Sequence, residues 1–117
     1  MWGGGLFERD FFYSECDRLG ILVTQDFLMA CGSYPEEDKA FTDHLSQEAE
    51  DAAIRLRNHP SLIWWTGDNE NAVNGSDNDE AYPGRISARR AIAPVLERLD
   101  PNRRFLPSSP YGGDKYS

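Results

Sequence analysis

The chain has 117 residues, of which 39% are hydrophobic, and it carries three tryptophans and a formal net charge of −8. This length suits one domain, and the apolar content is sufficient for a hydrophobic core. The acidic balance argues against nucleic acid or an anionic membrane as partner. It is compatible with a neutral, hydroxyl-rich ligand, although many soluble proteins are acidic simply for solubility. No apolar run approaches the roughly 20 residues of a membrane span.

Cysteine usage and the amino terminus bear on the compartment. Cys16 and Cys31 have neither CxxC spacing nor a dense cysteine framework around them, so both are predicted to be structural, reduced thiols. The amino terminus has no basic region followed by an apolar stretch, as a signal peptide would. Its first residues resemble the interior of a longer protein. Any signal peptide would lie upstream of Met1, so the sequence does not decide the compartment. A cytoplasmic location is favoured.

The first half of the chain predicts two helices and two strands. Apolar residues recur at helical spacing over residues 8–19, and Gly20 supplies a left-handed stop. The apolar run that follows predicts a buried strand over residues 21–25. A second helix is marked by an apolar stripe, which consists of Phe41, Leu45, Ala49, Ala52 and Leu56. Pro60 ends this helix near Asn58, and residues 61–66 form the next predicted strand.

The second half begins with a long polar loop over residues 67–83, and loops of this length are usually functional or disordered. A third apolar stripe then predicts a helix that ends near Leu99. Pro94 lies inside this pattern, where it either kinks the helix or starts its second half. Residues 104–106 begin the last predicted strand.

The resulting alternation of helices and strands predicts an α/β fold with a parallel sheet. Polar clusters follow each strand: Gln25-Asp26, residues 68–71 and Ser108-Ser109. The carboxyl ends of parallel strands meet at one rim, about 4.8 Å apart from strand to strand, so Asp26 and Glu70 could approach one another. Paired carboxylates are what glycoside hydrolysis needs. The alternative at this point is that these are solvated loop acids.

Other constellations fit less well. A calcium loop aligned on Gly75 would place Ala72 and Ala81 where oxygen ligands are required. His44 and His59 lack the spacing of a zinc site, and both are expected on helix surfaces or ends. A dinucleotide-binding glycine motif and a serine-hydrolase elbow are also absent from the sequence. We therefore expect neither a metal nor a cofactor.

Two aromatic features need separate treatment. Trp64 and Trp65 are adjacent, so a strand would direct them to opposite faces. Trp2 precedes three glycines, which fill no space around it. Its indole is a candidate platform for the C–H face of a sugar, and anchoring in the core is the alternative.

Five collinear segments carry a family resemblance. They are WGGGLFE at residues 2–8, GILVTQDF at 20–27, LRNHPSL at 56–62, GDNEN at 67–71 and PSSPYGG at 107–113. Together these segments resemble glycoside hydrolase family 2, and within it the β-mannosidase type. They extend over almost the whole chain. Thr24 stands where relatives often carry tryptophan, and Asp68 where they often carry asparagine, which bears on substrate preference.

The resemblance implies that residues 1–117 are a segment of a (β/α)₈-barrel catalytic domain, from the end of the second strand to the fifth. It implies retaining hydrolysis of terminal β-linked sugars, most specifically β-mannosides. Glu70 would be the general acid/base, and Asn69 would contact the sugar hydroxyl beside the anomeric carbon. Trp2 and Asp26 match positions that line the sugar pocket. The nucleophilic glutamate would lie on a later strand, beyond Ser117.

Several alternatives and partners remain at this point. The sugar could instead be that of another family 2 enzyme, a β-galactosidase or an exo-β-glucosaminidase. A non-catalytic carbohydrate-binding remnant is the alternative outside enzymes. The expected partners are a carbohydrate and either the rest of the barrel or a second copy of the chain, since a partial barrel exposes strand edges and apolar faces. Nucleic acid and membrane are not expected.

Overall fold

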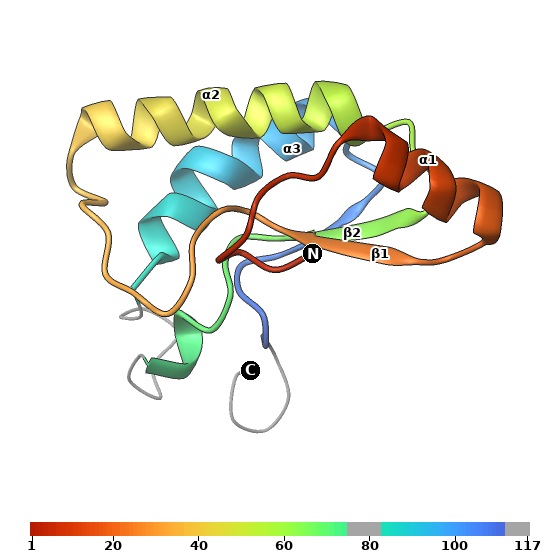
Figure 1. The fold of residues 1–117 in the computed structure, drawn as a ribbon. Helices are drawn as coiled ribbons and strands as arrows, with labels where there is room; N and C mark the ends of the chain where they lie inside the picture. Colours follow the sequence, from red (N-terminus) through yellow and green to blue (C-terminus); the bar gives the residue numbers. More distant parts are fainter. Residues whose placement is uncertain (75–82, 112–117) are drawn as a thin grey trace.

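The computed structural model describes residues 1–74 and 83–111, and its helices and strands alternate along the chain (Figure 1). In chain order the elements are α1 (Asp10–Leu19), β1 (Val23–Asp26), α2 (Lys39–Leu56), β2 (Leu62–Thr66), a 3-10 turn (Ala72–Asn74), a π-helical segment (Ser87–Ile92), α3 (Ala93–Leu99) and β3 (Arg104–Leu106). The predicted alternation is therefore confirmed. No helix in the two described ranges is long and apolar enough to cross a membrane.

The three strands form one parallel sheet in the order β1-β2-β3. Gln25 lies opposite Trp65 in the register, and Trp65 lies opposite Phe105. The predicted α/β class and the parallel pairing are thus confirmed. The carboxyl ends of all three strands therefore lie at the same edge of the sheet, as predicted for the polar clusters that follow them.

The sheet has one face covered by helices. Trp65 is fully buried and stacks on Phe27 with ring centroids 5.5 Å apart. Helices α2 and α3 lie on the same side of the sheet (Figure 1), and their apolar stripes complete the core. Trp64 is only partly buried, and by the alternation of a strand it projects to the opposite face. The predicted division of the two tryptophans is confirmed.

The junction between α1 and β1 corrects one prediction. Gly20 ends α1 in the left-handed region at φ 70°, as predicted. Residues 21–25 were expected to be a buried strand, but β1 begins only at Val23. Ile21 and Leu22 are 50% and 67% exposed. They belong to the turn that leaves the helix, where the amide of Ile21 still donates to the oxygen of Cys16 (2.9 Å).

Helix α2 is stabilised by a capping residue at its start and by an apolar stripe along one face. The carboxylate of Asp38 accepts a hydrogen bond from the amide of Ala40 (2.8 Å) and caps the first turn. Four residues of the predicted stripe are buried: Leu45, Ala49, Ala52 and Leu56. The structure also settles the place of Pro94, which occupies the first turn of α3 after the π-helical segment. The amide of Ala93 closes the π-helical segment by donating to Ala88, and Pro94, which has no amide to donate, follows at the start of α3.

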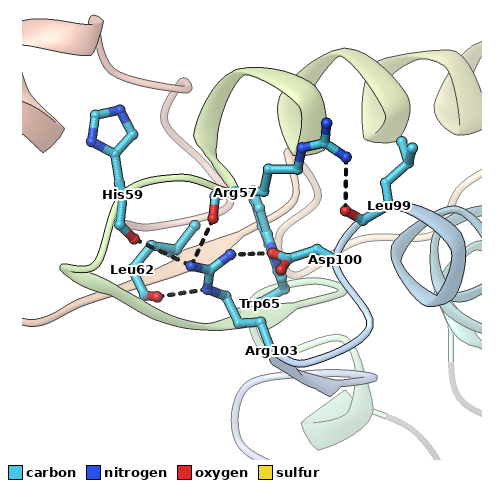
Figure 2. Close-up of polar contacts among 7 residues, drawn as sticks. All are labelled: Arg57, His59, Leu62, Trp65, Leu99, Asp100 and Arg103. Carbon is cyan, nitrogen blue, oxygen red and sulfur yellow. Dashed lines mark hydrogen bonds and ion pairs between the residues drawn. The ribbon is translucent and has the colours of Figure 1, made fainter.

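At the amino end of the sheet, a polar network fastens β2 and β3 to the helices (Figure 2). The guanidinium of Arg103 donates to three main-chain oxygens, those of Arg57, His59 and Leu62. It also forms an ion pair with Asp100. The second partner of Asp100 is the indole N–H of Trp65 (2.9 Å). One arginine thus ties the end of α2, the start of β2 and the turn before β3 together.

Candidate functional site

Main-chain pairing between the three segments continues past the carboxyl ends of the strands. Asn69 forms isolated parallel bridges with Ala30 on one side and Ser109 on the other. The amide of Glu70 donates to the oxygen of Ser109 (2.8 Å), and the amide of Cys31 donates to the oxygen of Asn69 (2.9 Å). The polar segments after the three strands are therefore held side by side at one rim.

Asp26, at the end of β1, holds the amino-terminal loop to this rim. One carboxylate oxygen accepts from the amide of Gly3 (3.1 Å), and the other accepts from the hydroxyl of Thr66. Burial raises the pKa of Asp26. Met1 also borders β1, because it donates to the oxygen of Thr24 and accepts from the amide of Asp26 (3.0 Å), as in a parallel bridge.

Trp2 lies at the same rim with 58% of its surface exposed. The alternative of core anchoring is therefore wrong. A side chain at Gly4 would collide with the indole, and one at Gly3 would collide with the main-chain oxygens of Phe27 and Met29. The glycines that follow Trp2 are thus needed for close packing of the loop, and the indole rests over Gly4.

Asn69 and Glu70 are joined by a thiol. The carboxylate of Glu70 lies 3.4 Å from the sulfur of Cys31, and the side-chain amide of Asn69 lies 3.6 Å from the same atom. The contact with Glu70 raises the pKa of the Cys31 thiol. Both cysteines are free, and Cys16 is buried as expected of a structural thiol. Cys31 is free as predicted, but it is exposed at the rim and not a buried structural thiol.

The backbone at this point is unusual. Cys31 and Glu70 have φ values of 48° and 61°, in the left-handed region that non-glycine residues seldom adopt. Such conformations cost about 1–3 kcal/mol each and persist only where the surroundings impose them. A hollow of about 360 Å³ opens beside them, lined by Cys31, Gly32, Ser33, Asn71 and Pro83.

Behind Glu70 lies Asp68, which the sequence analysis placed in the polar cluster at this rim without a catalytic or binding role. Asp68 is fully buried, and one of its oxygens accepts from the hydroxyl of Ser108 and from the amide of Asn71 (3.2 Å). Its other oxygen has no hydrogen-bond partner among residues 1–74 and 83–111. Burial raises the pKa of Asp68 from its ordinary value of 3.8 to about 6, and the charge of Asp26 adds to this effect.

The structure thus groups the predicted residues in two pairs. Trp2 lies in the loop that Asp26 holds, and Asn69 lies with Glu70 around Cys31. Their roles toward a sugar stay predictions. Within residues 1–74 and 83–111, no group of three or more histidine, cysteine or acidic side chains is arranged to hold a metal ion. Gly75 and Ala81, which entered the calcium alternative, lie outside the described residues.

Comparison with known proteins shows that the chain is similar to proteins named β-mannosidases. The β-mannosidase of Bos taurus is 38% identical over 125 residues, and β-mannosidase B of Thermothelomyces thermophilus is 37% identical over 127 residues. These matches cover 98% and 96% of this chain, but only 14% and 15% of the relatives. No family model matches the chain.

A solved structure supports the same relationship. The crystal structure of β-D-mannosidase from Dictyoglomus thermophilum superposes with a TM-score of 0.89 at 43% sequence identity. The match covers 98% of this chain and 14% of that protein. Along almost its whole length the chain is therefore homologous to a segment of β-mannosidases, which confirms the resemblance carried by its sequence motifs.

Proposed function

We propose that residues 1–117 are a segment of the (β/α)₈-barrel catalytic domain of a retaining exo-glycosidase that hydrolyses terminal β-mannosides. In this proposal β1, β2 and β3 are the third, fourth and fifth barrel strands, and Met1 marks the end of the second. Glu70 is the general acid/base. Asn69, Trp2 and Asp26 contact the sugar, and the nucleophilic carboxylate comes from a strand outside residues 1–117.

The observation that carries this proposal is the position of Glu70. Its exposed carboxylate follows Asn69 at the carboxyl end of the central strand β2, where parallel α/β proteins place their functional groups. Its amide is bound to the segment after β3, and its side chain contacts the segment after β1. The carboxylate is thus positioned by all three strands, as a group that must transfer a proton requires.

The chemistry follows from two carboxylates. The nucleophile attacks the anomeric carbon, and the bond to the leaving oxygen breaks with its electron pair on that oxygen, which takes the proton of Glu70. Glu70 then accepts a proton from water as the water displaces the enzyme carboxylate. The indole of Trp2 would stack on the C–H face of the sugar. The buried carboxylate of Asp26 would accept hydrogen bonds from sugar hydroxyls.

The partner in this proposal is the remainder of the barrel. Several large apolar side chains are more than half exposed, among them Leu22 (67%) and Phe11 (74%). Exposed apolar surface of this kind favours association. We therefore expect the isolated chain to self-associate in light scattering, in spite of its charge. A sharp monomer peak with cooperative unfolding would speak against this part of the proposal.

The enzymatic part is tested by transplanting the chain. The matching segment of the Dictyoglomus thermophilum β-mannosidase would be replaced by this chain, and the chimera assayed with aryl β-mannosides, β-galactosides and β-glucosaminides. In Glu70→Gln, hydrolysis of a β-mannoside with a poor leaving group should fall by roughly 10²–10⁴-fold. An activated aryl β-mannoside should still form the glycosyl-enzyme, and azide should restore its turnover with a β-mannosyl azide as product.

Asp26→Asn is the companion variant. It should weaken binding and rate with no rescue by azide, because a sugar-contacting group does not supply a proton. If Glu70→Gln hydrolyses the poor substrate at the rate of the unsubstituted chimera, Glu70 is not the acid/base. An α-mannosyl azide would instead assign Glu70 as the nucleophile. A preference for β-galactosides or β-glucosaminides would overturn the sugar assignment.

A further inference from the structure

Asp68, two residues before Glu70, is a fully buried carboxylate on the inner side of the turn that carries Glu70. The side chain of Asp68 accepts from the main-chain amide of Asn71 (3.2 Å), which closes the turn around Asn69 and Glu70. The same oxygen accepts from the hydroxyl of Ser108, in the segment after β3. One buried carboxylate oxygen therefore fixes both the shape of the turn and its attachment to the neighbouring strand.

Main-chain bonds on either side reinforce this arrangement. The oxygen of Asp68 accepts from the amide of Ser109 (2.9 Å), and the amide of Glu70 donates to the oxygen of Ser109 (2.8 Å). The side-chain oxygen of Asn71 accepts from the amide of Gly32 (3.0 Å). Glu70 stands within this frame at φ 61°, a conformation that needs external support.

We propose that Asp68 is a positioning residue, which holds the Asn69–Glu70 turn in its left-handed conformation and so places the Glu70 carboxylate against Cys31. The catalytic relevance of this inference rests on the proposed function, but the geometric claim does not. Asp68 is fully buried, so it acts through the turn and not by contact with a sugar.

The surroundings of Asp68 disfavour its charge, so its shape and its hydrogen bonds carry this role. The acids whose charges act on it are Asp26 from β1 and Glu36 from the segment before α2, and both oppose its ionisation. Its second oxygen faces Gly84, where an added Cβ would lie only 2.7 Å away. Asparagine has the same shape and keeps an oxygen toward Ser108 and Asn71. It should therefore preserve the turn without the charge.

The reactivity of the Cys31 thiol reports on the position of Glu70 in this chain, without the rest of the barrel. The thiol titrates high because it contacts Glu70, so displacement of Glu70 lowers the pKa and accelerates alkylation by iodoacetamide at neutral pH. The pH profile of alkylation at Cys31 would be followed by peptide mass spectrometry. Glu70→Gln sets the rate expected when the acidic contact is lost, which should be alkylation at least roughly threefold faster at neutral pH.

Three variants test Asp68 itself. Asp68→Ala should move the Cys31 profile toward that of Glu70→Gln. Ser108→Ala, a milder change, should move it in the same direction but less. Asp68→Asn should move it only slightly, because the charge of Asp68 is the smallest of the causes that raise the pKa of the Cys31 thiol and the contact with Glu70 is the largest. If circular dichroism shows that Asp68→Ala does not fold, Ser108→Ala and Asp68→Asn still show whether Asp68 positions Glu70.

Controls separate positioning from general loosening and from the proposed function. Asp100→Asn weakens the opposite end of the sheet and should leave the Cys31 profile unchanged. If Ser108→Ala and a folded Asp68→Ala titrate like the unsubstituted chain while Glu70→Gln shifts, Asp68 does not position Glu70. If Asp68→Asn shifts as far as Asp68→Ala, the shared shape is not what matters, and the inference also fails. Failure of the azide experiment in the chimera would leave these outcomes untouched.

Discussion

The two ends of the sheet satisfy their polar groups in opposite ways. At the amino end, Arg103 and Asp100 are only 12% and 11% exposed, and both are hydrogen-bonded to charged or main-chain partners (Figure 2). At the carboxyl end, one carboxylate oxygen of Asp68 and the side-chain nitrogen of Asn71 are buried without a hydrogen-bond partner in the described part of the chain. Both left-handed non-glycine residues of the described chain also lie there.

This difference shows which end of the sheet stabilises the fold and which end destabilises it. A buried charge that is paired on all sides holds elements together, whereas a buried polar atom without a partner costs about 1–3 kcal/mol. The hydroxyl of Ser61 is an unpaired atom at the amino end, but it carries no charge. In barrel proteins the amino-end face is associated with stability and the carboxyl-end face with function. The contrast supports reading the rim of Glu70 as the functional end.

The largest expected effect tests the amino end. Arg103→Ala removes the ion pair with Asp100 and leaves that carboxylate buried, together with three main-chain oxygens. Loss of one partner from a buried pair costs about 3–5 kcal/mol, which urea denaturation would measure. Arg98→Ala is the matched control, because its pair with Glu50 is exposed (56% and 35%) and should contribute about 0–1 kcal/mol. If Arg103→Ala and Arg98→Ala lose the same stability, the buried network at the amino end does not stabilise the fold more than an exposed ion pair does.

Gly84→Ala tests the crowded side of the rim. Gly84 has φ 91°, and an added Cβ would lie 2.7 Å from Asp68 and 2.8 Å from Asn71. Backbone strain and overpacking together should cost about 2–4 kcal/mol in urea denaturation. Gly20→Ala separates the two causes, because Gly20 has φ 70° but open space around it, and strain alone should cost about 1–2 kcal/mol. If the two variants lose the same stability, the rim around Asp68 is not tightly packed.

Asp68→Asn tests the cost of the buried charge itself. Folding raises the pKa of Asp68 from 3.8 to about 6, so the folded chain binds this proton more tightly than the unfolded chain. Asp68 therefore costs nothing below pH 3.8, and its cost grows as the pH rises to about 6 and is complete above it. At pH 8 the variant should be more stable by about 2–3 kcal/mol, and near pH 3.5 the difference should vanish. A larger difference in acid than at pH 8 would reverse the assigned sign.

Much of the fold could be predicted because its signals are local. The stripe of α2, its capping Asp38 and the αL stop at Gly20 are all contained in short stretches of sequence. The rim followed from them, since parallel strands must align their carboxyl ends. The exposure of Ile21 and Leu22 could not be predicted, because burial depends on what other segments pack against a residue.

The candidate site shows the same limit more sharply. Asp26 and Glu70 were predicted to share a rim from their places after two strands, and the roles predicted for Glu70, Asn69, Trp2 and Asp26 came from the family resemblance. Asp68 is next to Asn69 in sequence, but its burial depends on Ser108 and Gly84, which are distant in the chain. The exposed thiol of Cys31 was missed for the same reason, since cysteine is usually buried.

The smallest expected effect on stability concerns Trp2, and it makes the strongest distinction between fold and function. Its indole is 58% exposed, so Trp2→Ala should change the free energy of unfolding of this chain by less than about 0.5 kcal/mol. Trp65→Ala, in the core, should cost about 3–5 kcal/mol as the contrasting case. In the chimera, Trp2→Ala should nevertheless lower kcat/KM for a β-mannoside, because a sugar face would lose its stacking surface. An indole that contributes to hydrolysis but not to stability must act on the ligand. If Trp2→Ala leaves kcat/KM unchanged, Trp2 is outside the sugar site, and the loop held by Asp26 serves the fold alone.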